Sequence, residues 1–321
     1  MSNILRSTVS AAVLAAAIGA VSPASAQALL ADVSIEGPIQ EFLPVAPGEK
    51  APDGITDIVG AMRVMGAVIK VPATAAIHSP TNDDLTWEQY STGAFPQRSE
   101  PGFLGGTAIV TGDSQGGVMY ATDVFSDMSE NVIVGEATTS VIDGPAIRAT
   151  VNNVRLVPLD DPRMPAGRPI NGFGFEVNPA DIEPGTLVAV EGYYAGGQLN
   201  YHSFEADGAR LVNPTTAEVS VLRAQCRIRG GGRDELEVRG GSKNPANAVI
   251  RIQYLNSLGA WVNVNPTVTA TADNTVTPAQ GLFRYNASNL RFPGGVCPGQ
   301  IRAAFNANIN VNSGGFTPDS R

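Results

Sequence analysis

The chain has 321 residues, of which 21 are Lys or Arg and 30 are Asp or Glu, so its formal net charge is −9. This acidity argues against nucleic acid as a partner, because phosphate contacts need clustered basic side chains. Glycine and proline are abundant, at 35 and 23 residues, and no segment after the N-terminal region keeps the 3.6-residue apolar period of a helix, so we expect an all-β protein.

The N-terminus predicts a cleavable secretory signal peptide over residues 1–26. An apolar run follows Arg6, and Ala24 and Ala26 occupy the small-residue positions of a cleavage site. The run is shorter than the roughly 20 residues of a membrane-spanning helix, so a retained anchor is the weaker alternative. We expect cleavage after Ala26, no membrane span, and a protein free in the periplasm or outside the cell.

Charge divides the rest of the chain into two parts. Residues 27–213 hold 9 Lys or Arg and 24 Asp or Glu, a net charge of −15, whereas residues 214–321 hold 11 against 6, a net charge of +5. This asymmetry indicates separate domains. It also suggests self-association of the acidic part with the basic part, within one molecule or between molecules. The alternative is that each domain carries its own solubilising charge.

Residues 27–53 are rich in Pro and Gly and predict an extended leader with no core of its own. Beyond them, residues 105–127 align without a gap on residues 185–207, with six identities, four of which are glycines. Each segment reads as a strand, a Gly-Gly turn and a second strand, which is typical of a β-hairpin. We expect two tandem small barrels, at 54–127 and 128–213.

The segments before each hairpin are also compatible with strands. In the first copy they are Met62 to Val71 and Leu85 to Tyr90, and in the second copy they are Val132 to Val141 and Ile147 to Val157.

Residues 176–199, which run from Glu-Val-Asn-Pro to Gly-Gly-Gln-Leu, carry a Gly, two further residues, Val-x-Val-x-Gly and a Gly turn. This pattern resembles an exported bacterial family of OB-like barrel repeats of unknown function, and residues 54–127 match it less well. The resemblance implies a fold and export, and it implies no activity.

The basic part, residues 214–321, contains six alternating runs separated by turns. It resembles an immunoglobulin-like or fibronectin type III-like sandwich. Cys226 and Cys297 are the only cysteines, and in an oxidising compartment we expect them to form a disulfide. Two free thiols and a two-Cys metal site are the alternatives.

One motif and the two histidines could suggest hydrolytic chemistry. Gly112-Asp113-Ser114-Gln115-Gly116 satisfies G-x-S-x-G, but a nucleophile elbow joins a strand to a helix, and this serine lies in a predicted hairpin. We therefore interpret Ser114 as a turn residue. The two histidines, His78 and His202, have no partner at a matched spacing, and we interpret them as surface or strand residues.

Acidic pairs occur at Asp83-Asp84 and Asp160-Asp161. Adjacent acids on a strand point to opposite faces, so neither pair alone forms the carboxylate dyad of a glycosidase. Loop acids could hold calcium, whose oxygen ligands are varied, but the spacing matches neither an EF-hand loop nor a nonapeptide calcium repeat. We expect no cofactor, with calcium left open.

Tyr193, Tyr194 and Tyr201 lie in or beside the second hairpin turn. Aromatic side chains on an exposed turn of an OB-like barrel could stack on sugars or bases, and packing against a neighbouring domain is the alternative. We expect a non-enzymatic exported module that binds a protein or polysaccharide or assembles at the cell surface. The alternative is a glycan-acting enzyme that uses Asp160 and Asp161.

Overall fold

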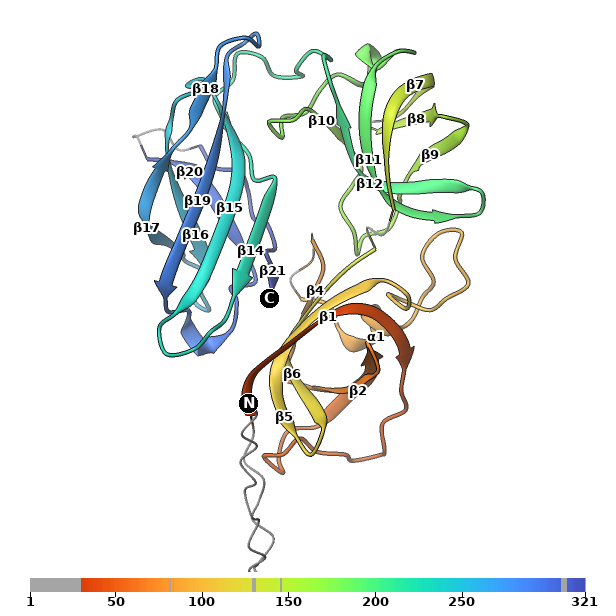
Figure 1. Cartoon of the computed structure of the whole chain (residues 1–321), viewed down its shortest axis with the longest axis vertical. Helices are drawn as coiled ribbons and strands as arrows, with labels where there is room; N and C mark the ends of the chain where they lie inside the picture. Colours follow the sequence, from red (N-terminus) through yellow and green to blue (C-terminus); the bar gives the residue numbers. More distant parts are fainter. Residues whose placement is uncertain are drawn as a thin grey trace, which may run out of the picture.

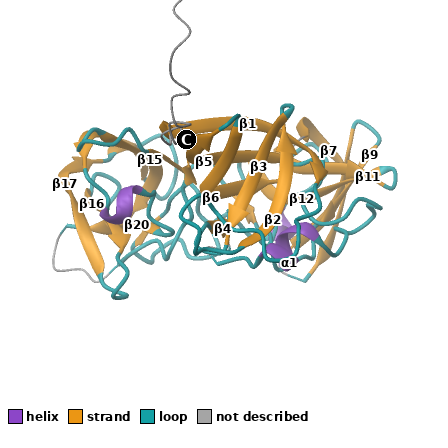
Figure 2. Ribbon diagram, turned by 90° about the horizontal axis from the view of Figure 1, so that it is seen from below, coloured by secondary structure: helices purple, strands orange, loops and turns teal. Residues whose placement is uncertain are grey.

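The computed structural model describes residues 30–80, 82, 84–128, 131–144, 146–306 and 311–320. The predicted signal peptide and its cleavage site lie outside these residues. The described chain is almost entirely β and forms two small barrels beside a sandwich (Figure 1), which confirms the predicted fold class. Its helices are short segments among the strands (Figure 2), and none of them has the length and hydrophobicity that crossing a membrane requires.

Barrel 1 has the strand order of an OB fold. Its strands are β1 (Leu30–Phe42), β2 (Ile58–Val64), β3 (Ala67–Pro72), β4 (Ala76–His78), β5 (Thr107–Gln115) and β6 (Val118–Asp127), with helix α1 (Trp87–Ser91) between β4 and β5. They are ordered β3-β2-β1-β5-β6-β4, and a parallel pairing of β3 with β6 closes the barrel.

The predicted leader over 27–53 is wrong for Leu30–Phe42, which is the first strand of barrel 1. This strand pairs with β5 along its first part and with β2 along its last part, and Ile39 is buried in the core. Pro38 lies where β1 passes from one partner to the other, a position that tolerates a missing N–H. Gly37 and Pro38 therefore mark the point at which β1 changes its pairing partner from β5 to β2. Barrel 1 begins before residue 54.

Two further strand predictions in barrel 1 need correction. Met62–Val71 is divided by a turn at Gly66, which has a φ of 82°, into the ends of β2 and β3. Leu85–Tyr90 forms most of helix α1 and its cap. The Thr86 hydroxyl accepts from the Gln89 N–H at 3.2 Å, and the Gln89 side chain accepts from the Thr86 N–H at 2.8 Å, so a capping box starts a helix in a segment too short to show its period.

Barrel 2 repeats the same strand order. Its strands are β7 (Asn131–Asp143), β8 (Ala146–Val151), β9 (Val154–Pro158), β10 (Pro169–Ile170), β11 (Leu187–Ala195) and β12 (Gln198–Ala206), with a 3-10 turn, η1, at Pro179–Asp181. They are ordered β10-β12-β11-β7-β8-β9, and a parallel pairing of β12 with β9 closes the barrel. The predicted strand Val132–Val141 lies within β7, and Ile147–Val157 divides into β8 and β9.

The two aligned hairpins, β5–β6 and β11–β12, share a β-bulge. Its register shift falls at Gly112 in barrel 1 and at Gly192 in barrel 2. A Cβ atom at either glycine would lie 2.1 Å from a carbonyl oxygen of the neighbouring strand, that of Tyr120 or Asn200. The bulge therefore needs glycine for close backbone approach. A common origin of the two barrels stays a prediction.

The third unit is a sandwich of two sheets. One sheet contains β13 (Glu218–Val219), β14 (Arg223–Arg227), β15 (Asp234–Lys243), β18 (Thr271–Asp273), β19 (Gln280–Leu290) and β21 (Asp319–Ser320); the other contains β16 (Val249–Leu255), β17 (Trp261–Thr269) and β20 (Ile301–Phe305). Both sheets are antiparallel except for the parallel pairing of β14 with β21. A 3-10 turn, η2, lies at Pro293–Gly295. Cys226 and Cys297 are disulfide-bonded in the core between the sheets, as predicted.

Arg163, in the loop after β9 of barrel 2, joins the two barrels. Asp161 holds its guanidinium through bonds of 2.9 and 2.7 Å. The same guanidinium donates to the carbonyls of Gln89, Thr92 and Gly93 at the end of α1 and lies 3.9 Å from the centre of the Phe95 ring. One largely buried ion pair thus satisfies the open end of a helix in the other barrel.

Lys243 lies at the junction of barrel 2 and the sandwich and is fully buried. Its ammonium group is 2.6 Å from the carboxylate of Glu218, donates to the Asn213 carbonyl and lies 5.2 Å from the centre of the Phe175 ring of barrel 2. Barrel 1 also contacts the sandwich, since β21 packs on β5 and β6. Each unit therefore touches the other two.

Candidate binding sites between the units

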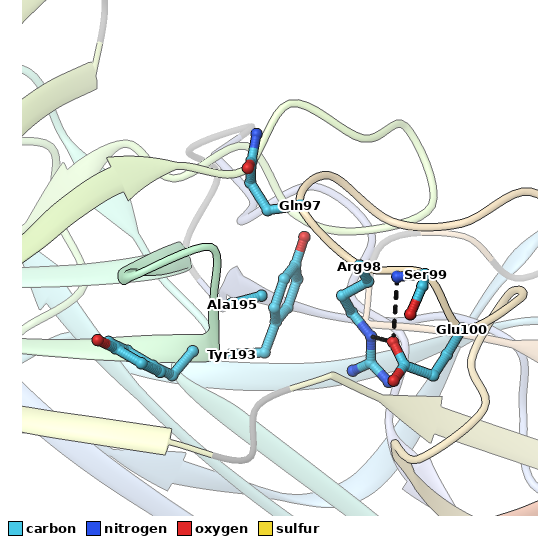
Figure 3. A pocket seen from close by; sticks show the side chains of 7 residues that line it. Gln97, Arg98, Ser99, Glu100, Tyr193 and Ala195 are labelled. Atoms are coloured by element: carbon cyan, nitrogen blue, oxygen red, sulfur yellow. Dashed lines mark hydrogen bonds and ion pairs between the residues drawn. The ribbon is translucent and has the colours of Figure 1, made fainter.

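A polar pocket of about 360 Å³ lies between the barrels (Figure 3). The loop after α1 lines it with Gln97, Arg98, Ser99 and Glu100, and the β11–β12 hairpin lines it with Tyr193, Tyr194 and Ala195. Arg98 and Glu100 form an ion pair at 3.6 Å. The Glu100 carboxylate also accepts from the Ser99 N–H at 3.2 Å, and these contacts, the backbone bonds foremost, hold its pKa below the usual value.

The three tyrosines predicted to bind a ligand do not act together. Tyr201 is fully buried in barrel 2, where its hydroxyl donates to the Ile147 carbonyl. Tyr193 is also buried, and its hydroxyl donates to the Pro96 carbonyl of barrel 1 at 2.7 Å. Tyr194 alone is exposed, at 58%. Packing thus accounts for two of them, and Tyr194 remains as a contact surface at the pocket.

A larger cleft, of about 880 Å³, lies where all three units meet. Its walls combine charged, polar and apolar side chains. They include Thr107, Ile109 and Asp127 of barrel 1, Val132, Glu191 and His202 of barrel 2, and Val221, Arg223 and Phe316 of the sandwich.

His202 is the unsatisfied polar group of this cleft. Its side chain is only 6% exposed, and its Nε2 atom lies 3.3 Å from the Asp127 carboxylate of barrel 1 without the alignment of a hydrogen bond. The Nε2 atom is itself buried, so His202 forms part of the cleft wall through its contact with Asp127 across the two barrels. The prediction that His202 is a plain strand residue missed this position, because its neighbours come from distant segments.

His78 also has a carboxylate partner that the sequence does not reveal. Its Nε2 atom lies 2.9 Å from the Asp123 carboxylate, and both side chains are buried. The parallel pairing of β4 with β6 places His78 beside Phe125 and near Asp123. This buried pair supports the packing of β4 against the barrel and lines neither cavity. Of the interpretation of His78 as a surface or strand residue, the strand part is confirmed, since His78 ends β4, and the surface part is wrong.

The other candidates are distributed over the molecule. Ser114 lies near the end of β5 and pairs with Met119 across the hairpin. The carboxylate of Asp161 is paired with Arg163, and that of its neighbour Asp160 is exposed. Asp83 lies outside the described residues. Within the described ranges no three His, Cys, Asp or Glu side chains gather at metal-binding distances. The carboxylates predicted for a glycan-acting enzyme are therefore not paired with one another.

No protein-family model, curated protein or solved structure matches this chain.

Proposed function

We propose that this protein is an exported, non-enzymatic binding module whose ligand occupies the cleft between the three units. The observation that carries the proposal is the cleft of about 880 Å³ where the three units meet, with His202 of barrel 2 and Asp127 of barrel 1 side by side on its wall. Binding sites are typically concave, mostly pre-formed and located at domain interfaces, with a few placed polar groups. Contacts between each pair of units hold such a cleft in shape.

The lining of the cleft favours a protein segment over a polysaccharide. Four acids, Glu36, Asp127, Glu176 and Glu191, line it against two arginines, Arg168 and Arg223. Arg168 is 2.9 Å from Glu176, so the remaining walls are net acidic. Sugars bind best on exposed aromatic faces, whereas the aromatic walls here are largely buried edges of the barrels. An extended segment with apolar and basic side chains complements these walls.

The two histidines make this proposal testable by NMR. The chain contains only His78 and His202, so a spectrum of the imidazole protons has two sets of signals, and His202→Gln identifies which set belongs to the cleft. Pools of short peptides rich in Lys, Arg and apolar residues, and a panel of neutral and acidic oligosaccharides, serve as probes. We expect a peptide pool to shift the His202 signals and to leave those of the buried His78 in place.

Two variants locate the binding. Glu191→Gln, in the cleft, should weaken binding of the peptide pool, and Tyr194→Ala, in the polar pocket between the barrels, should leave it unchanged. If only oligosaccharides shift the His202 signals, the ligand class is wrong; if no probe shifts them, or if an oligosaccharide is cleaved, the proposal itself fails.

A further inference from the structure

The smaller sheet of the sandwich, formed by β17, β16 and β20, carries a polar outer face. Ile250, Ile252 and Ala303 point into the core between the sheets, so the side chains that alternate with them point outward. Strand β17 lies on the side of the sandwich away from both barrels (Figure 1). We call the outward residues Arg251, Gln253, Trp261, Asn263 and Arg302 the arginine–tryptophan face.

A chain of hydrogen bonds orders this face. Gln253 is in register with Asn263 on one side and with Arg302 on the other. The Arg302 Nε–H donates to the Gln253 side-chain oxygen at 2.8 Å, and the Gln253 amide donates to the Asn263 side-chain oxygen at 2.8 Å. The Arg302 guanidinium thereby reaches across the sheet and lies 4.3 Å from the centre of the Trp261 ring, a cation–π contact. The face is therefore pre-formed.

Arg251 places a second positive charge beside the first. Its guanidinium donates to the Phe305 carbonyl at 3.0 Å, and its Nε atom is buried without a hydrogen-bond partner. Burial lowers the pKa of Arg302 below its ordinary value, and the charge of Arg251 lowers it further. Both arginine side chains are partly exposed, and their outer N–H groups are not among the buried ones. Two cations thus share one accessible face.

The sandwich supplies no counter-charge to this face. Residues 244–318 contain four arginines and one acid, Asp273, whose carboxylate accepts from the N–H and the hydroxyl of Thr275. Within the described residues, the ion pairs of the sandwich belong to the other sheet and its loops, and none involves Arg251 or Arg302. A negatively charged ligand would supply the missing charge.

The neighbours of the two arginines indicate what kind of anion fits. Trp261 is partly exposed, and an indole ring packs well on the apolar face of a sugar ring. Asn263 is exposed, and an amide can donate to and accept from sugar hydroxyls. A planar carboxylate matches the two parallel N–H groups of a guanidinium. The net charge of −9 disfavours nucleic acid and anionic membranes, which need clustered basic side chains.

We propose that the arginine–tryptophan face binds an acidic polysaccharide built from uronic acids. One sugar ring lies against Trp261, and its carboxylate pairs with Arg251 and Arg302. None of these residues lines the central cleft or the pocket between the barrels, so the site is separate from both and does not depend on a ligand in the cleft.

Fluorescence of Trp261 tests the proposal. The chain has two tryptophans, so Trp87→Phe in the full chain leaves Trp261 as the reporter. The probes are oligogalacturonate, a neutral dextran oligosaccharide, dextran sulfate and poly-glutamate. We expect oligogalacturonate to change the fluorescence saturably, the neutral sugar to leave it unchanged, and the sulfated and the non-sugar anions to bind more weakly.

Two variants in the same background remove one cation each. Arg251→Gln and Arg302→Gln should each weaken oligogalacturonate binding about tenfold or more, the loss expected for a charge-assisted hydrogen bond. Arg291→Gln is the matched control, because it removes the same charge from an exposed position outside the face, and it should bind like the parent. Circular dichroism and the melting temperature establish that all three variants fold.

Absence of oligogalacturonate binding would overturn the proposal, and so would an equal loss in Arg291→Gln. Equal binding of dextran sulfate or poly-glutamate would overturn the assignment to a uronic-acid sugar. The NMR signals of His202 separate this site from the cleft. They should stay in place when oligogalacturonate is added, and a shift would place the sugar in the cleft and overturn the assignment to this face.

Discussion

At the scale of single residues, Arg163 of barrel 2 donates hydrogen bonds to three carbonyls of barrel 1. Replacing it with Ala would leave Asp161 without its buried partner and three carbonyls at the end of α1 without a donor. Breaking a buried ion pair of this kind costs roughly 3 kcal/mol. We expect Arg163→Ala to lower the free energy of unfolding by that amount in urea titrations, and Arg163→Lys to recover little of it, because an ammonium group lacks the planar fork of Arg.

The matched control is Arg155→Ala, on the exposed face of β9, which should change stability by less than about 0.5 kcal/mol. Equal losses in both variants would show that Arg163 acts only as a surface charge.

Glu205 gives a residue-scale prediction about pH. Burial and the charges of Asp207 and Glu191 raise its pKa in the folded state, so the folded protein binds this proton more tightly than the unfolded chain does. Stability from this group is therefore greatest below the ordinary Glu pKa of 4.5 and falls as pH rises through the folded pKa. Glu205→Gln should raise the melting temperature at pH 7 and have little effect at pH 4.

Glu183→Gln, in the exposed loop before β11, is the control for the general effect of removing one negative charge. If the two variants stabilise the protein equally at pH 7, local repulsion and burial at Glu205 contribute nothing of their own.

At the scale of elements, the hairpins of both barrels depend on the bulge glycines Gly112 and Gly192, where the backbones of the two strands approach closely. Gly192→Ala would place a methyl group 2.1 Å from the Asn200 carbonyl oxygen, so β11 and β12 must separate, at a cost of about 3 kcal/mol. Gly197→Ala, in the turn of the same hairpin, meets no atom within 4 Å and should cost about 1 kcal/mol through its positive φ. Thermal denaturation of both variants measures the difference, and equal costs would refute the steric explanation.

The disulfide joins β14 of the sandwich to the segment before β20. It closes a loop of 71 residues, and loop entropy predicts roughly 4 kcal/mol of stabilisation. Trp87 lies in barrel 1 and Trp261 in the sandwich, so Trp87→Phe and Trp261→Phe each leave one fluorescent reporter. After reduction, we expect the transition reported by Trp261 to move to lower urea and that reported by Trp87 to stay. Labelling of both thiols in the native, unreduced protein would contradict the bond.

Local signals predicted the elements best. The Gly-Gly turns located both barrel hairpins, because turn chemistry depends on adjacent residues. The capping box at Thr86 and Gln89 is also a local signal, but α1 has only five residues, too few to show a helical period. β1 was missed because its Gly and Pro residues resemble those of a linker, and the partners that order it follow much later in the chain.

At the scale of the whole molecule, the candidate sites could not be predicted from the sequence. The contact of His202 with Asp127 joins two barrels, and that of His78 with Asp123 spans 45 residues; no motif encodes either distance. The tyrosine pattern indicated a hairpin that lines the pocket between the barrels, but not which of its side chains would be buried. By contrast, the opposite charges of residues 27–213 and 214–321 are readable from composition, and the structure adds the strand register that forms the arginine–tryptophan face.

The switch of partners along β1 has a consequence for how the chain folds. β1 precedes β5 by more than 60 residues, since Pro38 pairs with Thr107, so a long strand waits for its partner with an unpaired edge. Non-local pairing of this kind slows folding and exposes the chain to aggregation. Gly37 and Pro38 interrupt that waiting edge, as gatekeeper residues do. Pro38→Val should therefore leave the native barrel intact but increase light scattering during refolding. Gly37 and Pro38, which make β1 look like a linker in the sequence, would then also protect the unpaired strand from aggregation before the barrel closes.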